Sequence, residues 1–210
     1  PLTALLFADI CRQAELPDGV VNIVTGPGST GMSILTDPRI GKVAFTGSTS
    51  VGITIAQGIA GQGKALTLEL GGKAANIVFD DAALDQAVEG VINGIFFNQG
   101  EVCCAGSRLL VQESIADEFI ARLRDRMGTL RVGDPMDKNT DVGAINSRDQ
   151  MEKIAELVAS GVSEGADLWQ PACDLPTRGW FFRPTLFTGV AQRSEEYTSE
   201  LQSRFGISYA

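Results

Sequence analysis

The chain has 210 residues, of which 44% are hydrophobic and 20% are charged, a composition typical of a globular protein with one large domain or parts of two. Its formal net charge of −9 argues against a general affinity for nucleic acid, because that affinity depends on Lys and Arg neutralising phosphates. The chain contains no His, which excludes Ser-His and Cys-His catalysis and imidazole metal sites within this stretch, so a general base must be a carboxylate, Lys or Tyr.

The first third of the chain alternates helical and extended patterns. Apolar residues recur at helical spacing over residues 1–15, which predicts a helix. The β-branched run Val20–Val24 predicts a strand that leads into a glycine-rich loop. Four further elements are expected in this order: a short helix over 31–36, a strand over 42–45, a helix over about 50–60 and a strand over 65–70.

The same alternation continues along the rest of the chain. A strand over 76–79 precedes a helix that Asp80 or Asp81 caps and that runs to Phe97. The later elements are a strand over 107–111, a helix from a capping box at Ser114–Asp117 to about Leu130 with an i,i+4 pair of Glu118 and Arg122, a helix over 147–160, and an irregular strand over 181–187 that Pro184 interrupts. Strands and helices that alternate through short connections predict parallel α/β structure.

The cysteines and the apolar runs indicate the cellular setting. Cys11, Cys103, Cys104 and Cys173 match no zinc-binding spacing and are too few for a disulfide scaffold, so we expect no metal site and a reducing cytoplasm. No apolar run approaches the roughly 20 residues that span a bilayer, and no secretory signal is visible, so no membrane partner is expected.

The end of the chain differs from the rest. From Arg193 to Ala210 the sequence resembles a translated sequencing-adapter oligonucleotide around a variable index at Arg204–Gly206. We therefore expect residues 193–210 to be a non-native tail, and they are left out of the fold prediction.

The segment Asn98–Gly106 is the first candidate for chemistry. Cys103 follows a predicted helix in a polar, glycine-flanked loop, where a thiol can be partly exposed and reach a ligand. Free cysteines are commonly buried, however, and taken alone the segment fits two small core thiols better.

Glu69 is the second candidate. It stands at the end of an apolar strand before Gly71 and Gly72, at the edge of a parallel sheet where ligands bind. Burial there would raise its pKa toward the range useful for a base. By itself, a surface or capping Glu is the simpler interpretation.

The third candidate is Phe45–Gly52, a strand that enters a helix through small residues. Such a turn presents backbone N–H groups and a helix N-terminus to a phosphate. The turn lacks the dinucleotide-binding glycine fingerprint, and taken alone it fits an ordinary strand–helix turn better.

Taken together, these segments resemble the aldehyde dehydrogenase superfamily. Leu68–Lys73, continued to Asn76, is similar to its glutamate motif, and Phe96–Ser107 is similar to its cysteine motif. The separation of the two residues, 103 − 69 = 34, also fits the family. The resemblance covers residues 1–192, and two long motifs in register make it specific.

The resemblance implies a fold, a reaction and residue roles. Residues 1–70 would be the end of a Rossmann-like NAD(P)-binding domain, and 71–192 the start of the α/β catalytic domain, both truncated. Cys103 would attack an aldehyde to give a thiohemiacetal and then a thioester, with NAD or NADP as the hydride acceptor, and Glu69 would activate the hydrolytic water. Cys104 would pack behind Cys103. The implied cofactor-binding residues are Gly47, Ser48, Gly52, Leu70, Gln150 and Lys153.

Other parts of the family pattern bear on activity. The oxyanion Asn and cofactor Lys are expected before Pro1, and the ribose-binding Glu where the tail begins, so we expect an internal fragment that is inactive alone. The resemblance further implies a small aldehyde substrate and a homodimeric or homotetrameric parent protein. Two alternatives remain: a CoA-acylating relative, against which the presence of Glu69 argues, and a non-catalytic structural relative, against which Cys103 and Glu69 together argue.

Overall fold

The computed structural model describes residues 1–190 and 206–207. They form two compact units, Pro1–Glu69 and Leu70–Ala210, and each is described by itself. The expected tail at 193–210 lies outside the described residues, apart from Gly206 and Ile207.

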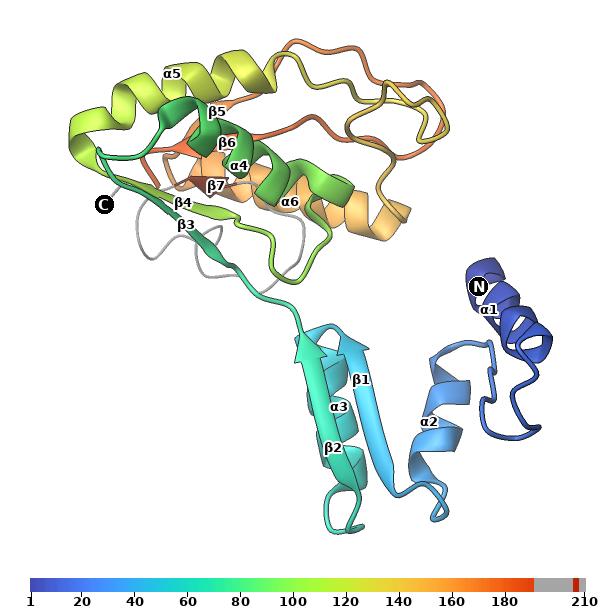
Figure 1. The fold of residues 1–210 in the computed structure, drawn as a ribbon. Coiled ribbons are helices and arrows are strands. Elements are labelled where there is room, and N and C mark those ends of the chain that lie inside the picture. Colours follow the sequence, from blue (N-terminus) through green and yellow to red (C-terminus); the bar gives the residue numbers. More distant parts are fainter. Residues whose placement is uncertain (191–205, 208–210) are drawn as a thin grey trace. The chain divides into compact units, whose positions relative to one another are not determined.

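The first unit is built around one strand–helix–strand motif (Figure 1). Its elements are α1 (Leu2–Gln13), α2 (Gly28–Thr36), β1 (Lys42–Gly47), α3 (Thr49–Ile59) and β2 (Ala65–Leu70). Strands β1 and β2 form a two-stranded sheet and point the same way, as expected for strands joined by a crossover helix. Leu35, Ile55 and Ile59 form its buried cluster, with Val43, Phe45 and Leu68 packed against them.

The prediction of a strand at Val20–Val24 is wrong. The segment is irregular, and Val20 and Val24 are each 64% exposed. β-Branched residues favour extended backbone, but a strand also needs a neighbouring strand to pair with. Within the described part of the first unit, β1 and β2 pair with each other, and no strand pairs with this segment.

The second unit contains a longer α/β arrangement. Its elements are β3 (Ala75–Val78), α4 (Leu84–Phe96), η1 (Phe97–Gly100), β4 (Arg108–Val111), η2 (Glu113–Ile115), α5 (Ala116–Met127), α6 (Arg148–Ser163), β5 (Asp167–Trp169), β6 (Leu186–Thr188) and β7 (Gly206–Ile207). Strand β3 pairs in parallel with β4, from Ala75 opposite Arg108 to Val78 opposite Val111, and β4 also pairs in parallel with β7. The parallel α/β prediction is therefore confirmed, whereas the antiparallel pair of β5 and β6 was not foreseen.

Helices α4 and α5 cover the β3–β4 strands and supply most of the core. The buried residues of α4 recur on one helical face: Val88, Val91, Ile92, Ile95 and Phe96. Those of α5 do the same: Ala116, Phe119, Ile120, Leu123 and Met127. Fully burying one large apolar side chain contributes about 1.5–3 kcal/mol, so this shared core is the main source of stability in the unit.

The side-chain caps predicted for α4, at Asp80 or Asp81, and for α5, at Ser114, are both wrong. Helix α4 begins after Ala83 and α5 after Ile115, and neither has a side-chain cap. The Gln112 side chain instead donates to Asp80 Oδ2 at 2.8 Å and to Ser114 Oγ at 3.1 Å. It also accepts from Asp80 N at 3.0 Å, so one glutamine engages both expected caps.

Other local predictions are confirmed. Arg122 pairs with Glu118 at 2.6 Å, and the helix predicted over 147–160 forms as α6. Ser147, for which no cap was predicted, caps this helix by accepting from Gln150 N at 3.2 Å. In the predicted strand over 181–187, only Leu186 onward forms β6, because Pro184 has no N–H to donate to a ladder.

Candidate active site

Cys103 lies at the tip of a tight turn. Ala105 N donates to Val102 O at 3.0 Å, so Cys103 and Cys104 are the two central residues of this turn. Val102 packs against the core of the second unit and Ala105 is 7% exposed, so both ends of the turn are anchored. Both thiols are exposed. The alternative of two buried core thiols is thus wrong, and so is the expectation that Cys104 packs behind Cys103.

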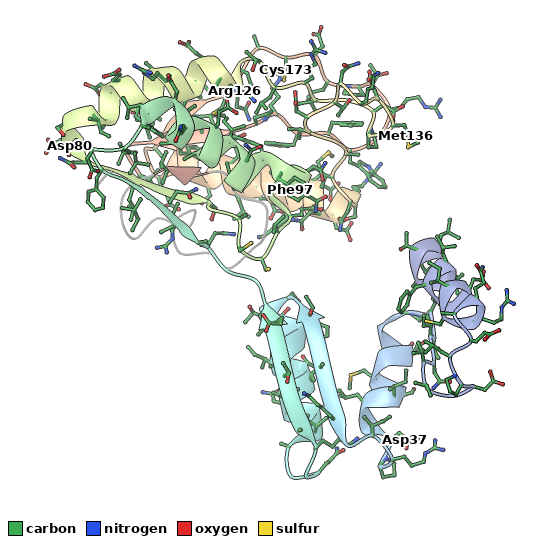
Figure 2. All side chains as sticks on the ribbon, viewed as in Figure 1. Asp37, Asp80, Phe97, Arg126, Met136 and Cys173 are labelled. Carbon is green, nitrogen blue, oxygen red and sulfur yellow. The ribbon has the colours of Figure 1, made fainter. Side chains whose placement is uncertain are left out.

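A left-handed turn leads from α4 to the cysteines. Asn98, Gln99 and Gly100 have φ values of 49°, 58° and 75°. This conformation costs a residue with a side chain about 1–2 kcal/mol, and only glycine adopts it freely. Within the turn, Asn98 O accepts from Glu101 N at 2.9 Å and Asn98 Nδ2 donates to Glu101 O at 3.2 Å. Figure 2 labels Phe97, the residue at which this turn begins.

Glu101 is a half-buried carboxyl two residues before Cys103. Burial raises the pKa of Glu101, and a hydrogen bond from the Asn146 backbone N–H opposes the rise. Burial thus disfavours the charged form of the carboxyl that precedes the cysteine turn.

The segment that follows β2 runs beside the cysteine turn. A Cβ placed on Gly72 would lie 3.8 Å from Cys103 O, which is ordinary van der Waals contact. Further along, Arg108 Nε donates to Lys73 O at 2.9 Å. The end of the glutamate motif and the cysteine motif are therefore neighbours within the second unit.

Glu69 itself belongs to the first unit, as the penultimate residue of β2. Its strand-end position agrees with the sequence analysis. However, Glu69 is exposed, so the expectation that this carboxylate is buried is wrong. Leu70, the last residue of β2, is half-buried.

The small residues after β1 form a helix N-terminus. Gly47 ends β1, Ser48 caps α3 by accepting from Val51 N at 3.4 Å, and Gly52 is buried in the first turns of the helix. A Cβ at Gly47 would overlap the Phe45 ring, which requires glycine there. The N–H groups that begin an 11-residue helix fit the chemistry of a phosphate ligand.

The last two cofactor candidates lie on α6. Gln150 is half-buried in the first turn, with its N–H bonded to Ser147. Lys153 is exposed and pairs with Glu156 at 3.2 Å. The candidates thus divide between the units, with Gly47, Ser48 and Gly52 in the first and Leu70, Gln150 and Lys153 in the second.

The described residues contain no group of three or more His, Cys, Asp or Glu side chains arranged to hold a metal ion. Over the same residues, none of the helices combines the length and apolar character needed to traverse a bilayer.

Comparison with known proteins identifies the family. The profile of the aldehyde dehydrogenase family matches residues 1–203. The chain belongs to the aldehyde dehydrogenase family.

Individual family members agree over most of the chain. The aldehyde dehydrogenase of Emericella nidulans is 46% identical over 192 residues, which is 90% of this chain and 39% of that protein. Retinal dehydrogenase 2 of Rattus norvegicus is 48% identical over 193 residues, which is 90% of this chain and 37% of that protein. This chain therefore spans about two fifths of the length of these relatives.

Solved structures agree with the fold. The NAD-dependent aldehyde dehydrogenase from Sinorhizobium meliloti has a TM-score of 0.93 and 37% identity, covering 99% of this chain and 42% of that one. The NAD+ complex of the aldehyde dehydrogenase from Bacillus cereus has a TM-score of 0.94 and 35% identity, covering 100% and 43%.

In this aldehyde dehydrogenase chain, Asn76 and Gly106 support the cysteine turn, and sequence reasoning assigned them no role. Asn76 Nδ2 donates to Gly106 O at 2.9 Å, and a Cβ at Gly106 would overlap the Asn76 side chain. Both residues lie inside the two motifs, so the available signal was a polar residue in β3 together with a glycine in the cysteine motif.

Proposed function

We propose that the protein containing this chain oxidises an aldehyde to a carboxylic acid with NAD or NADP, using Cys103 as nucleophile and Glu69 as general base. The observation that carries the proposal is the exposed Cys103 thiol, held at the tip of an anchored turn. The glutamate motif continues into the second unit as far as Gly72, where an added Cβ would lie 3.8 Å from Cys103 O, so this end of the motif lies beside the cysteine turn.

The chemistry of this chain's residues follows from their positions. The Cys103 thiolate adds to the aldehyde carbon, and the Cys103 N–H helps to hold the resulting oxyanion. The bound nicotinamide supplies the acceptor for the hydride that leaves this carbon. Glu69 then takes a proton from water, which attacks the Cys103 thioester and releases the acid and the thiol.

The candidate cofactor-binding residues are proposed to contact two different parts of the dinucleotide. Gly47, Ser48 and Gly52 would receive the pyrophosphate at the N-terminus of α3, and this is supported by the small side chains that begin this 11-residue helix. Leu70, Gln150 and Lys153 would lie beside the rest of the dinucleotide. The same proposal makes residues 1–70 part of the cofactor domain and 71–192 part of the catalytic domain.

The proposal also includes a cellular setting and an assembly. All four cysteines are free thiols, which supports a reducing cytoplasm. A homodimer or homotetramer rests on the family alone, and sedimentation of the whole protein tests it.

Two variants test the proposed roles. Cys103→Ser should abolish aldehyde-dependent NADH formation. Glu69→Gln should still release one equivalent of NADH per site in a burst and then stall, with an acyl group on Cys103 visible by intact mass. Steady turnover in Cys103→Ser would refute the nucleophile, and undiminished turnover in Glu69→Gln would refute the base. Acyl-CoA in place of free acid would identify the CoA-acylating alternative.

A further inference from the structure

The turn that delivers Cys103 needs support from outside itself. Asn98, Gln99 and Gly100 are consecutive left-handed residues, and two of them carry side chains that disfavour this conformation. The hydrogen bonds between Asn98 and Glu101 close the turn but do not fix its direction relative to the core. Some other contact must hold the turn in place.

Gln99 provides one such contact. With its amide oriented to satisfy both ends, Gln99 Oε1 accepts from Gly143 N at 2.8 Å and Nε2 donates to Asn98 O at 3.0 Å. Gly143 is buried, and a Cβ there would lie 2.7 Å from the Gln99 amide atom that faces Gly143. Only glycine at 143 permits this approach.

Glu101 provides the second contact. Its carboxylate accepts from the Asn146 backbone N–H, three residues further along the same segment. Its Oε1 is buried and has no hydrogen-bond partner among the described residues. A half-buried carboxyl with one buried oxygen unpaired has its position determined by the single N–H that it does accept from.

The segment that receives both side chains is itself fixed. Val142 is buried in the core of the second unit, and Gly133 N donates to Val142 O at 3.0 Å. Ile145 is 4% exposed, and its N–H donates to Trp180 O at 2.7 Å. The segment then enters α6 through its cap at Ser147, so it cannot shift without disturbing that helix.

We propose that Gln99 and Glu101 are positioning residues that dock the Cys103 turn onto residues 143–146, through the N–H groups of Gly143 and Asn146. The functional consequence rests on the proposed role of Cys103, whereas the docking itself does not. Because the same segment leads into the helix of Gln150 and Lys153, docking also ties the nucleophile to the proposed cofactor side of this unit.

Three substitutions separate docking from general stability. Gly143→Ala places a methyl group against Gln99, and Glu101→Ala removes the acceptor for Asn146 N. Glu101→Gln keeps an acceptor oxygen and is the conservative rescue. Gly90→Ala is the matched control, because a Cβ at Gly90 in α4 meets nothing within 4 Å.

The first readout is amide hydrogen exchange in the full chain. Loss of one such hydrogen bond should speed exchange about fivefold at residue 143 in Gly143→Ala and at Asn146 in Glu101→Ala. Glu101→Gln and Gly90→Ala should exchange as wild type does. Unchanged exchange at both sites would overturn the docking, whatever the activity.

The second readout is the NADH burst in the whole enzyme. A misplaced nucleophile should slow the burst about tenfold or more in Gly143→Ala and Glu101→Ala, with the KM for aldehyde little changed. Glu101→Gln should restore the burst. Faster exchange with an unchanged burst would overturn the positioning role. A wild-type enzyme without any burst would refute the proposed function and leave the exchange result to decide the docking.

Discussion

The two units each contain a strand–helix–strand motif, but they differ in how much of it is buried. In β1–α3–β2 the buried apolar cluster consists of Leu35, Ile55 and Ile59. In β3–α4–β4 the motif shares a cluster of 17 buried residues with α5 and neighbouring segments. The same sequence pattern thus supports very different amounts of core within the described chain.

The difference comes from what packs against the motif. Helix α4 buries five residues because α5 packs against it, whereas α1 of the first unit has none buried and exposes Leu2, Leu6 and Phe7 by more than half. Hydrophobic periodicity reports which face a helix can bury, and burial follows only when another layer covers that face. The candidate nucleophile belongs to the better-packed unit.

The largest expected effect is a core truncation in the second unit. Phe119 is fully buried, so Phe119→Ala should lower the free energy of unfolding by about 3–5 kcal/mol. Trp169 and Trp180, the two Trp residues, both lie in this unit, so Trp fluorescence during urea unfolding measures it selectively.

The matched change in the first unit is Leu35→Ala, with an expected cost of about 2 kcal/mol because its small cluster can collapse around the gap. Amide exchange of α3 measures this loss. A cost for Leu35→Ala equal to that for Phe119→Ala would break the comparison.

The second prediction concerns glycines in the two units. Gly106→Ala forces a methyl group into the Asn76 side chain and should destabilise the second unit by about 1–3 kcal/mol. In α2 of the first unit, Gly31 has open space around it, so Gly31→Ala should stabilise by about 0.5–1 kcal/mol. Urea midpoints of both variants check the opposite signs, and destabilisation by Gly31→Ala would contradict the open packing.

The third prediction is a pH dependence of opposite sign in the two units. Hydrogen bonds from the Arg39 side chain and backbone hold the pKa of Asp37 well below its ordinary value. The contribution of Asp37 to the stability of the first unit is therefore present above the unfolded pKa, about 3.9, and is lost as pH falls. Burial raises the pKa of Glu101. The contribution of Glu101 to the stability of the second unit is therefore present below the unfolded pKa, about 4.3, and is lost as pH rises.

Variants of these two carboxyls isolate their contributions. Asp37→Asn should flatten the acid loss of stability in the first unit, and Glu101→Gln should flatten the loss with rising pH in the second. Amide exchange across this pH range measures the first, and Trp fluorescence in urea the second. A pH profile unaffected by Glu101→Gln would show that burial does not govern this carboxyl.

The smallest effect concerns ion pairs. Arg126 joins α5 to α4 through Glu89, with Nη2–Oε2 at 3.2 Å, and a double-mutant cycle should give a coupling of about 0.2–1 kcal/mol that falls with added salt. The Asp9–Arg12 pair on α1 is 3.6 Å apart and well exposed, so its coupling should be too small to measure. A larger coupling on α1 would contradict the ranking.

Much of the fold was predictable because it rests on local signals. Most helices and strands, including the helix that begins at Arg148, follow from hydrophobic periodicity. The failures involve contacts that periodicity does not report. Gln112 bonds Asp80, 32 positions away, and also its near neighbour Ser114, and the residues of Val20–Val24 find no partner among the described strands.

The candidate site divides in the same way. The loop position of Cys103 was readable from glycines and polar neighbours, and its exposure follows from the turn. The support from Gly143 and Asn146 was not readable, because it joins segments more than 40 positions apart. Left-handed backbone at Gln99 is likewise set by these tertiary contacts, since glutamine has no intrinsic preference for it.

The turn that exposes Cys103 exposes Cys104 as well, and this has a consequence for handling the protein in air. Successive α-carbons across a trans peptide are about 3.8 Å apart, closer than the roughly 4.4–6.8 Å that an unstrained disulfide spans. A sulfenic acid formed on one of these cysteines therefore cannot readily form a disulfide with the other. Further peroxide would oxidise it to irreversible states. Reductant during purification should preserve the nucleophile.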